Sequence, residues 1–328
     1  MRPRVFVTQP IAASALARLE AVADVAINND PLHICTRDEL IAAVRDADAL
    51  YCMLHDRVDA GVIDAAPRLK VIGSTTVTPA DIDLAAASRR RIPVTAVPSS
   101  YLDDATADLA WALLFAVGRR LAESDRLVRA GIIPGSQSCY LESLGISGRT
   151  LGIVGMGGVG KAAARRARGF PLRRIYHDPR RLSADEEREL DFTWVELDEL
   201  LRESDYVSLH VNLRPETRHL IGARELGLMK PTAYLINTAR GPIVDEAALI
   251  RALGSGRIAG AGLDVFEHEP GIPAELRGLP NTVLAAHIGS AVRELREKMA
   301  NTCVDTILDA LAGRRPAHVK NPEIYAAA

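Results

Sequence analysis

A glycine-rich turn between a strand and a helix limits the folds open to this chain more than any other part of its 328 residues. Residues 150–168 read TLGIVGMGGVGKAAARRAR, an apolar strand-like run followed by spaced glycines and a helical pattern. In that context the spacing predicts a dinucleotide-binding turn, because glycine permits a tight bend and close approach to a pyrophosphate at the helix N-terminus. The candidate cofactor-binding residues of this turn are Gly155, Gly157, Gly158, Val159 and Gly160.

An acidic residue ends the strand that follows this helix. The segment RRIYHD closes at Asp178, 18 positions after Gly160. A carboxylate there accepts hydrogen bonds from the adenosine ribose and repels a 2′-phosphate, which favours NAD over NADP. Arg180 and Arg181 leave NADP open, because an arginine can hold that phosphate. The alternative interpretation of Asp178 is a residue that simply starts a loop.

Short β-branched runs alternate with amphipathic helical patterns along the whole chain. This alternation indicates an α/β fold with doubly wound parallel sheets that carry helices on both faces. The length suggests two domains, and long helical patterns at 102–130 and 291–312 are natural connections between them. We therefore expect a discontinuous substrate domain at 1–99 and 291–328, with an NAD-binding Rossmann domain at 100–290 inserted into it.

Strand and helix positions follow from the same patterns. Thr36 with Glu39, and Ser183 with Glu186, are capping boxes that predict helix starts. Strands are expected at 5–8, 49–53, 70–72, 150–154, 174–177, 206–210, 234–237, 262–265 and 283–285.

The composition argues against several kinds of partner. The formal net charge is −2, so the chain lacks the basic footprint expected for binding nucleic acid or an anionic membrane. The four cysteines lie far apart without a C-x-x-C pair, and the histidines do not cluster with them, so we expect no metal site and no disulfide framework. The N-terminus shows neither a signal peptide nor a membrane-spanning run, and the cytoplasm is the expected location.

Charged or polar side chains follow three later strand-like runs, where open α/β sheets place their binding sites. The three motifs are INTARGPIVDE at 236–246, LDVFEHEP at 263–270 and AAHIGS at 285–290. The catalytic candidates in them are Arg240, Glu269 and His287.

These motifs resemble those of the D-isomer-specific 2-hydroxyacid dehydrogenase family. The resemblance covers nearly the whole chain and rests on GIVGMGGVG, LINTARGPIVDEAAL, GAGLDVFEHEP and PNTVLAAHIGS, in the family's order and with family-like spacing. It implies two Rossmann-like domains and a homodimer joined through the long helix of the nucleotide domain. It also implies that Arg240 binds substrate, that Glu269 pairs with the catalytic histidine and that His287 donates the proton.

The chemistry of these residue types supports the implied roles. Reduction of a 2-oxo acid needs a hydride from nicotinamide and a proton on the carbonyl oxygen. An unperturbed histidine titrates near pH ~6.5, so it can act as acid and as base. A carboxylate on its other ring nitrogen orients the ring, and the planar fork of Arg240 can bind the substrate carboxylate and polarise the carbonyl.

Further cofactor contacts are expected at the same edge of the sheet. Asp264 resembles the family aspartate near the nicotinamide carboxamide, and Thr106 resembles a threonine that faces the cofactor from the interdomain helix. Packing within a strand or helix is the alternative for both. His210 ends a strand and is expected to line the cofactor cleft, and Thr238, in INTARG, is a further cofactor-binding candidate.

Two neighbours of Glu269 compete for its role. Glu267 is the other acid of the E-x-E sequence, but the family's catalytic glutamate matches the second acid. His268 lies at a position that varies in the family, so we interpret it as a bystander.

The segment STTVTPADID, residues 74–83, departs from the family pattern. Many relatives carry G-V-G-x-D-N-x-D in this loop, and its backbone amides bind the substrate carboxylate. Both glycines are threonine here, and threonine does not easily adopt a positive φ. We expect a loop that bends differently or that presents hydroxyl groups. The candidate substrate-binding residues are Thr76, Val77, Thr78, Arg240 and His287.

The leading hypothesis is an NAD-dependent D-2-hydroxyacid dehydrogenase that reduces a small anionic 2-oxo acid, glyoxylate- or hydroxypyruvate-like by default. The first alternative is the phosphite dehydrogenase branch, although Val77 stands where that branch has a lysine. The second is the phosphoglycerate dehydrogenase branch, many members of which carry an added regulatory domain. The third is a non-enzymatic scaffold that senses NAD(H), as the C-terminal binding protein corepressors do.

Overall fold

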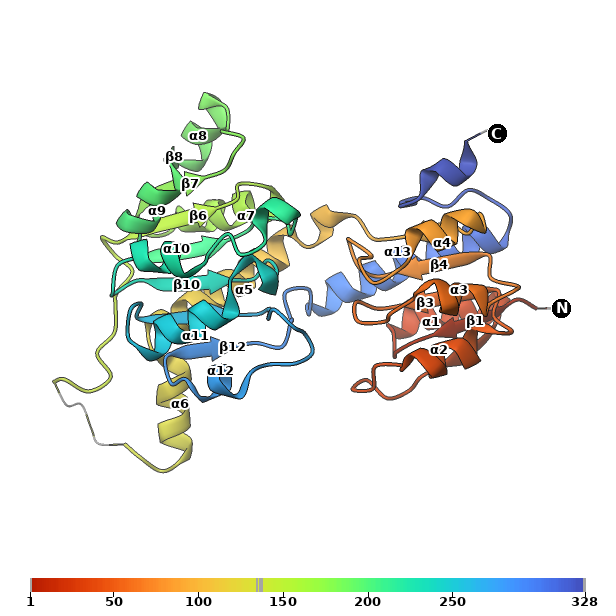
Figure 1. The fold of residues 1–328 in the computed structure, drawn as a ribbon, viewed down its shortest axis with the longest axis horizontal. Helices are drawn as coiled ribbons and strands as arrows, with labels where there is room; N and C mark the ends of the chain where they lie inside the picture. The colour runs from red at the N-terminus through yellow and green to blue at the C-terminus, as the bar shows by residue number, and fades with distance from the viewer. Residues whose placement is uncertain (1, 134, 136–137, 327–328) are drawn as a thin grey trace. The chain divides into compact units, whose positions relative to one another are not determined.

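The computed structural model describes residues 2–133, 135 and 138–326. The chain divides into two compact units (Figure 1). The terminal unit is formed by Met1–Tyr101 with Val292–Ala328, and the central unit by Leu102–Ala291. The substrate and cofactor roles that the sequence assigns to the two parts stay predictions. Met1, Ala327 and Ala328, which the predicted terminal domain includes, lie outside the described residues.

The terminal unit is built on a five-stranded parallel sheet in the order β2-β1-β3-β4-β5. Buried residues of α1 and α13 pack on one face with those of β1, and residues of α2, α3 and α4 pack on the other face. The strands are β1 Arg4–Val7, β2 Asp24–Ile27, β3 Ala49–Cys52, β4 Val71–Ser74 and β5 Val94–Thr95. The helices are α1 Ala13–Val22, α2 Arg37–Val44, α3 Ala60–Asp64, α4 Leu84–Arg89 and α13 Arg293–Leu311, with short 3₁₀ turns at Ser99–Tyr101 and Pro322–Tyr325.

The central unit is built on a seven-stranded parallel sheet in the order β12-β11-β10-β9-β6-β7-β8. Helices α5 and α7 pack on one face, and α9, α10, α11 and α12 on the other. The strands are β6 Thr150–Val154, β7 Arg173–His177, β8 Thr193–Trp194, β9 Tyr206–Leu209, β10 Tyr234–Asn237, β11 Gly260–Leu263 and β12 Thr282–Leu284. The helices are α5 Asp103–Gly118, α6 Leu121–Arg129, α7 Gly158–Ala167, α8 Ala184–Leu190, α9 Leu197–Glu203, α10 Ala223–Leu228, α11 Glu246–Gly254 and α12 Ala274–Gly278, with 3₁₀ turns at Pro215–Thr217 and Gly241–Ile243.

The strand order of the central sheet reverses next to the glycine turn. The chain runs from β6 outward to β7 and β8, then returns to the other side of β6 with β9. Ligands of open α/β sheets bind at such a switch point, beyond the carboxyl ends of the strands. The predicted α/β fold with two doubly wound parallel sheets is confirmed.

One long helix of the prediction is wrong. The pattern at 102–130 forms two helices, because Arg120 adopts a left-handed backbone with a φ of 50° between α5 and α6. Its guanidinium turns back to the carboxylate of Glu123, with both nitrogen–oxygen distances at 2.9 Å. None of the residues of α6 is buried, so no core contact keeps it in line with α5.

Several other local predictions are confirmed. Both capping boxes are confirmed, at the starts of α2 and α8, and α13 lies within the predicted 291–312. The strands that the sequence missed are β2, β5 and β8, all at sheet edges. β2 and β8 are partly exposed, and β5 and β8 have only two residues each, so none of the three gives a long apolar run. No described helix is long and apolar enough to cross a lipid bilayer.

Candidate active site

A histidine–glutamate pair lies beyond the carboxyl ends of β11 and β12. His287 Nδ1 lies 2.7 Å from Glu269 Oε2, and both side chains are mostly buried. The second oxygen, Glu269 Oε1, accepts a hydrogen bond from the Phe266 amide at 2.8 Å. A carboxylate held in this way fixes the orientation of the imidazole. The structure therefore brings together two of the three predicted catalytic residues.

Asp264 holds the backbone around His287. Its carbonyl oxygen accepts the His287 amide at 2.9 Å, Oδ1 accepts the Ile288 amide at 2.7 Å and Oδ2 accepts the Gly289 amide at 2.9 Å. His287 itself has a φ of 52°, in the left-handed region that costs a non-glycine residue about 1–2 kcal/mol. Asp264 is fully buried, and burial raises the pKa of its carboxyl. The predicted contact of Asp264 with a cofactor stays a prediction.

Arg240 follows β10, next to the strand that leads to Glu269. Its side chain is half-buried, and its Nη1 donates to the Ala239 carbonyl at 2.7 Å. Burial lowers the pKa of Arg240, and the nearby carboxylate of Glu269 opposes that effect. A residue that the sequence reasoning missed, Asn237, fixes this turn: its Nδ2 donates to the Arg240 carbonyl and its Oδ1 accepts the Ala239 amide, both at 3.0 Å. Its position at the end of an apolar strand is the sequence feature that could have indicated this role.

The glycine turn fits a dinucleotide. A Cβ on Gly155 would lie 2.8 Å from the His210 carbonyl group, and one on Gly160 would lie 2.1 Å from the Gly155 oxygen, so both positions require glycine. A Cβ on Gly157 would meet open space, so the backbone there is accessible to a ligand. Helix α7 begins at Gly158 without a side-chain cap, which leaves its first amides available to a pyrophosphate.

Asp178 lies at the end of β7, beside this turn. Its Oδ2 accepts the Met156 amide at 2.8 Å and its Oδ1 accepts the Arg180 amide at 2.9 Å. Arg181 is paired with Glu187, with nitrogen–oxygen distances of 2.8 and 3.0 Å. Arg180 is exposed and forms no ion pair within the described part of the chain. Asp178 therefore directly follows β7 and contacts the glycine turn, and its role in selecting NAD over NADP stays a prediction.

Three other predicted cofactor residues lie at the same edge. His210 Nε2 is 2.9 Å from Ser208 Oγ, while its Nδ1 is buried with no hydrogen-bond partner among the described residues. Burial lowers the pKa of His210 to about 4. Thr238 Oγ1 is likewise buried without a partner in the described chain, and the buried Thr106 would touch a Cβ added to Gly289. Buried polar atoms left without partners are the kind that a bound ligand satisfies.

The loop at 74–83 in the terminal unit closes through its own side chains. Ser74 Oγ lies 2.8 Å from Thr76 Oγ1 and accepts the Thr76 amide at 3.2 Å. None of these ten described residues has a positive φ, so the threonines take backbone conformations that any residue can adopt. Whether the loop bends differently from that of its relatives stays a prediction. The Thr76 hydroxyl is therefore occupied, whereas Thr78 is exposed.

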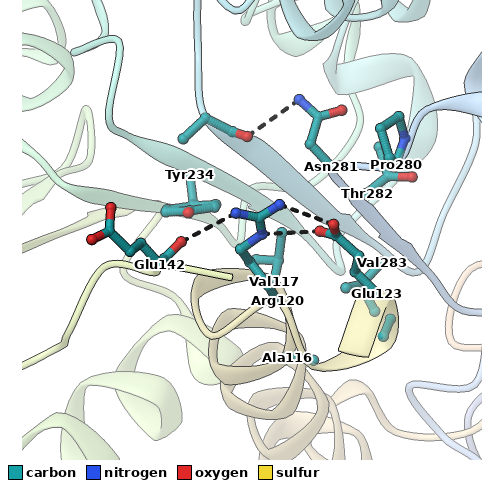
Figure 2. Close-up of a pocket in the computed structure, with 12 residues that line it drawn as sticks. Ala116, Val117, Arg120, Glu123, Glu142, Tyr234, Pro280, Asn281, Thr282 and Val283 are labelled. Carbon is teal, nitrogen blue, oxygen red and sulfur yellow. Dashed lines mark hydrogen bonds and ion pairs between the residues drawn. The ribbon is translucent and has the colours of Figure 1, made fainter. Parts of the chain in front are cut away.

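A cavity of about 300 Å³ lies at the opposite end of the central sheet (Figure 2). It is lined by residues at the amino ends of β10, β11 and β12 and at the α5–α6 junction, where Arg120 bonds Glu123 and the Glu142 carbonyl. The three motifs all lie at the carboxyl ends, so this cavity is separate from the candidate active site.

Comparison with known proteins places the whole chain among proteins of one family. The family model described as D-isomer specific 2-hydroxyacid dehydrogenase, NAD binding domain, matches residues 111–289. The glyoxylate reductase of Thermococcus litoralis is 44% identical over 328 residues, 99% of this chain and 98% of its own. The TT0316 protein from Thermus thermophilus is 41% identical, with a TM-score of 0.86 over 97% of this chain and 99% of its own. An NADPH-dependent glyoxylate/hydroxypyruvate reductase from Sinorhizobium meliloti, solved with NADP and malonate, is 30% identical, with a TM-score of 0.79 over 100% and 99% of the two chains.

Proposed function

The chain belongs to the D-isomer specific 2-hydroxyacid dehydrogenase family, and on that basis we propose that it reduces glyoxylate or a similar small 2-oxo acid through His287, Glu269 and Arg240. It is a nicotinamide-dependent oxidoreductase that transfers a hydride between the cofactor and a 2-oxo acid. The observation that carries the residue assignment is the 2.7 Å contact between His287 Nδ1 and Glu269.

Each residue has a defined role in the proposed reaction. The nicotinamide, when bound, supplies the hydride that the carbonyl carbon accepts. His287 donates a proton to the carbonyl oxygen from Nε2, because Nδ1 is held by Glu269. Glu269 stabilises the imidazolium form, and in the reverse direction His287 takes the proton back. The guanidinium of Arg240 binds the substrate carboxylate and polarises the carbonyl.

Cofactor binding is assigned to the glycine turn of the central unit and to the residues around it. The open face of Gly157 and the uncapped start of α7 support a pyrophosphate there. Thr106, Thr238, His210 and Asp264 are proposed to contact the cofactor at the same edge. We assign NAD rather than NADP, since the Asp178 carboxylate would face the ribose and repel a 2′-phosphate.

The terminal unit is proposed to supply further substrate contacts. Thr76, Val77 and Thr78 hold the position at which relatives bind the substrate carboxylate. Thr78 is the residue of the three most able to present a hydroxyl, because it is exposed while the Thr76 hydroxyl already contacts Ser74. Glyoxylate is the first substrate to test, because the T. litoralis relative is a glyoxylate reductase.

A homodimer joined through the central unit is also proposed. Helix α6 projects from the lower end of that unit in Figure 1, and it exposes Leu121 and Val128, which are 61% and 52% accessible. Apolar side chains left uncovered on a helix are typical of a surface that another chain covers. Changing both residues to Asp should give a monomer in sedimentation analysis, whereas Leu32→Asp, at an exposed site of the terminal unit, should not.

The catalytic assignment is tested by His287→Ala and Glu269→Gln with NADH and glyoxylate. General acid catalysis contributes about 10²–10⁴-fold, so turnover should fall by that order in His287→Ala while NADH still binds. His268→Ala is the matched control, because His268 is exposed and adjacent to Glu269. Turnover that survives in His287→Ala, or that falls as far in the control, would contradict the assignment.

A further inference from the structure

We propose that Glu246 and Glu267 form a clamp that positions Arg240 and Glu269 relative to one another. The clamp joins the arginine turn, residues 238–246, to the glutamate turn, residues 264–270. Neither Glu246 nor Glu267 is assigned contact with substrate or cofactor, so both are positioning residues. The inference rests on the roles proposed above for Arg240 and Glu269, and it explains how two separate turns keep a common geometry.

The two turns follow neighbouring strands and touch each other through the backbone. β10 and β11 are parallel partners, with Asn237 opposite Leu263 at their ends. A Cβ on Gly241 would lie 1.8 Å from the Phe266 carbonyl oxygen, so only glycine permits this contact. The Asp264 amide also donates to the Asn237 carbonyl at 2.9 Å. The two turns are therefore in direct contact, so a shift of one turn would move the other.

Glu246 and Glu267 exchange a reciprocal pair of hydrogen bonds across this contact. The Glu246 amide donates to Glu267 Oε2 at 3.2 Å, and the Glu267 amide donates to Glu246 Oε2 at 3.2 Å. Glu246 is only 7% exposed and the Glu267 side chain 9%. Buried amides without acceptors would be costly, so each carboxylate satisfies a donor on the opposite turn.

Two side chains of a third segment, residues 218–221, contact the carboxylate of Glu267. His219 Nε2 lies 2.6 Å and Arg218 Nη2 3.0 Å from Glu267 Oε1. Burial works to raise the pKa of Glu267, but the hydrogen bond from His219 and its other neighbours hold that pKa below its usual range. For Glu246 burial prevails and raises the pKa, and the carboxylates of Glu267 and Glu269 act in the same direction.

The same third segment is itself bound to the arginine turn. The His219 amide donates to the Pro242 carbonyl at 2.8 Å, the Ile221 amide to the Ile243 carbonyl at 3.1 Å, and the Asp245 amide to the Ile221 carbonyl at 3.0 Å. Glu267 thus contacts two segments that also hold each other. This closed set of contacts separates the two acids of the E-x-E sequence: Glu269 pairs with His287, and Glu267 ties the turn in place.

Loss of the clamp should reduce turnover more than cofactor binding. A displacement of about 1 Å at a reacting group can cost on the order of 10²-fold in rate. We expect Glu246→Ala to lower kcat with glyoxylate by about 10- to 100-fold, with the Kd of NADH within about twofold of wild type. Glu246→Gln keeps an oxygen for the Glu267 amide and should restore most of the turnover.

Glu225→Ala is the matched control. Glu225 Oε2 also accepts a backbone amide, that of Gly222 at 3.0 Å, but its helix carries no candidate catalytic residue. Both Ala variants should lower Tm, and only Glu246→Ala should lower kcat. If Glu246→Ala does not fold, Glu246→Asp, one methylene shorter, gives the same comparison.

The results with these variants can contradict the clamp and the proposed function separately. Wild-type kcat in Glu246→Ala, or an equal loss in Glu225→Ala, would overturn the clamp while leaving the proposed function intact. Full turnover in His287→Ala would instead overturn the proposed function on which the clamp rests. The two failures are therefore distinguishable within one set of variants.

Discussion

Asp264→Asn tests whether the backbone around His287 is held by a buried carboxylate. In the wild-type protein the two carboxylate oxygens accept the amides of Ile288 and Gly289 at 2.7 and 2.9 Å. Asparagine keeps one acceptor and turns an NH₂ group toward the other amide. One buried donor then loses its partner, which costs about 1–3 kcal/mol of folding free energy.

The effect on turnover follows from the backbone of His287. Its φ of 52° is disfavoured by about 1–2 kcal/mol for a non-glycine residue, and Asp264 provides the contacts that hold it there. Loss of that restraint would shift the population of the left-handed conformation by roughly 5- to 30-fold. We expect kcat to fall by a similar factor in steady-state reduction of glyoxylate, with urea denaturation reporting the loss of stability.

Asp205→Asn is the control for a purely structural loss. Asp205 is also buried in the central unit, where it accepts the Thr150 amide at 2.9 Å and Lys230 Nζ at 3.0 Å. It lies at the amino ends of the strands, away from His287. Comparable destabilisation with unchanged kcat is expected. Wild-type kcat in Asp264→Asn, or the same drop in Asp205→Asn, would refute the reasoning.

Three further predictions follow from the site. Asp178→Ala should lower the ratio of kcat/KM with NADH to kcat/KM with NADPH. Asp185→Ala, which changes an exposed acid on α8, should leave that ratio unchanged. An unchanged ratio in Asp178→Ala would show that Asp178 does not select the cofactor. Thr78→Val and Thr76→Val should change the ratio of the rates with glyoxylate and hydroxypyruvate more than they change the affinity for NADH. The same ratio in the variants and the wild type would show that residues 74–83 form a turn without a role in substrate choice. Burial lowers the pKa of His210 to about 4 in the folded protein, below its value of ~6.5 in the unfolded chain. As the pH falls from ~6.5 to about 4, the unfolded chain binds this proton before the folded protein does. The free energy of unfolding should therefore decrease over that range, by at most about 3 kcal/mol. His210→Gln should flatten that part of the curve of unfolding free energy against pH for the cofactor-free protein, and a curve like that of wild type would contradict the assignment.

Much of the central sheet could be predicted from the local pattern of apolar residues in the sequence. The strands at 150–154 and 234–237 and both capping boxes are where the sequence placed them, because each depends on neighbouring residues only. The same holds for the glycine turn. The break at Arg120 could not be predicted in this way, since the apolar pattern continues across it. Arg120 adopts its left-handed backbone just before a helix in which no residue is buried.

By itself, the sequence determined the fold class and the strand–turn–helix segment with its spaced glycines, and it predicted candidate residues for proton transfer, because these depend on spacing within single segments. The family resemblance already implied that Glu269 pairs with His287, and the tertiary structure showed in addition that Glu267 faces His219. It also showed that the Asp264 carboxylate accepts the amides of the two residues after His287. It also showed that Ser74 closes the threonine loop. Those arrangements depend on hydrogen bonds and backbone angles set by packing, which residue identity and spacing do not specify.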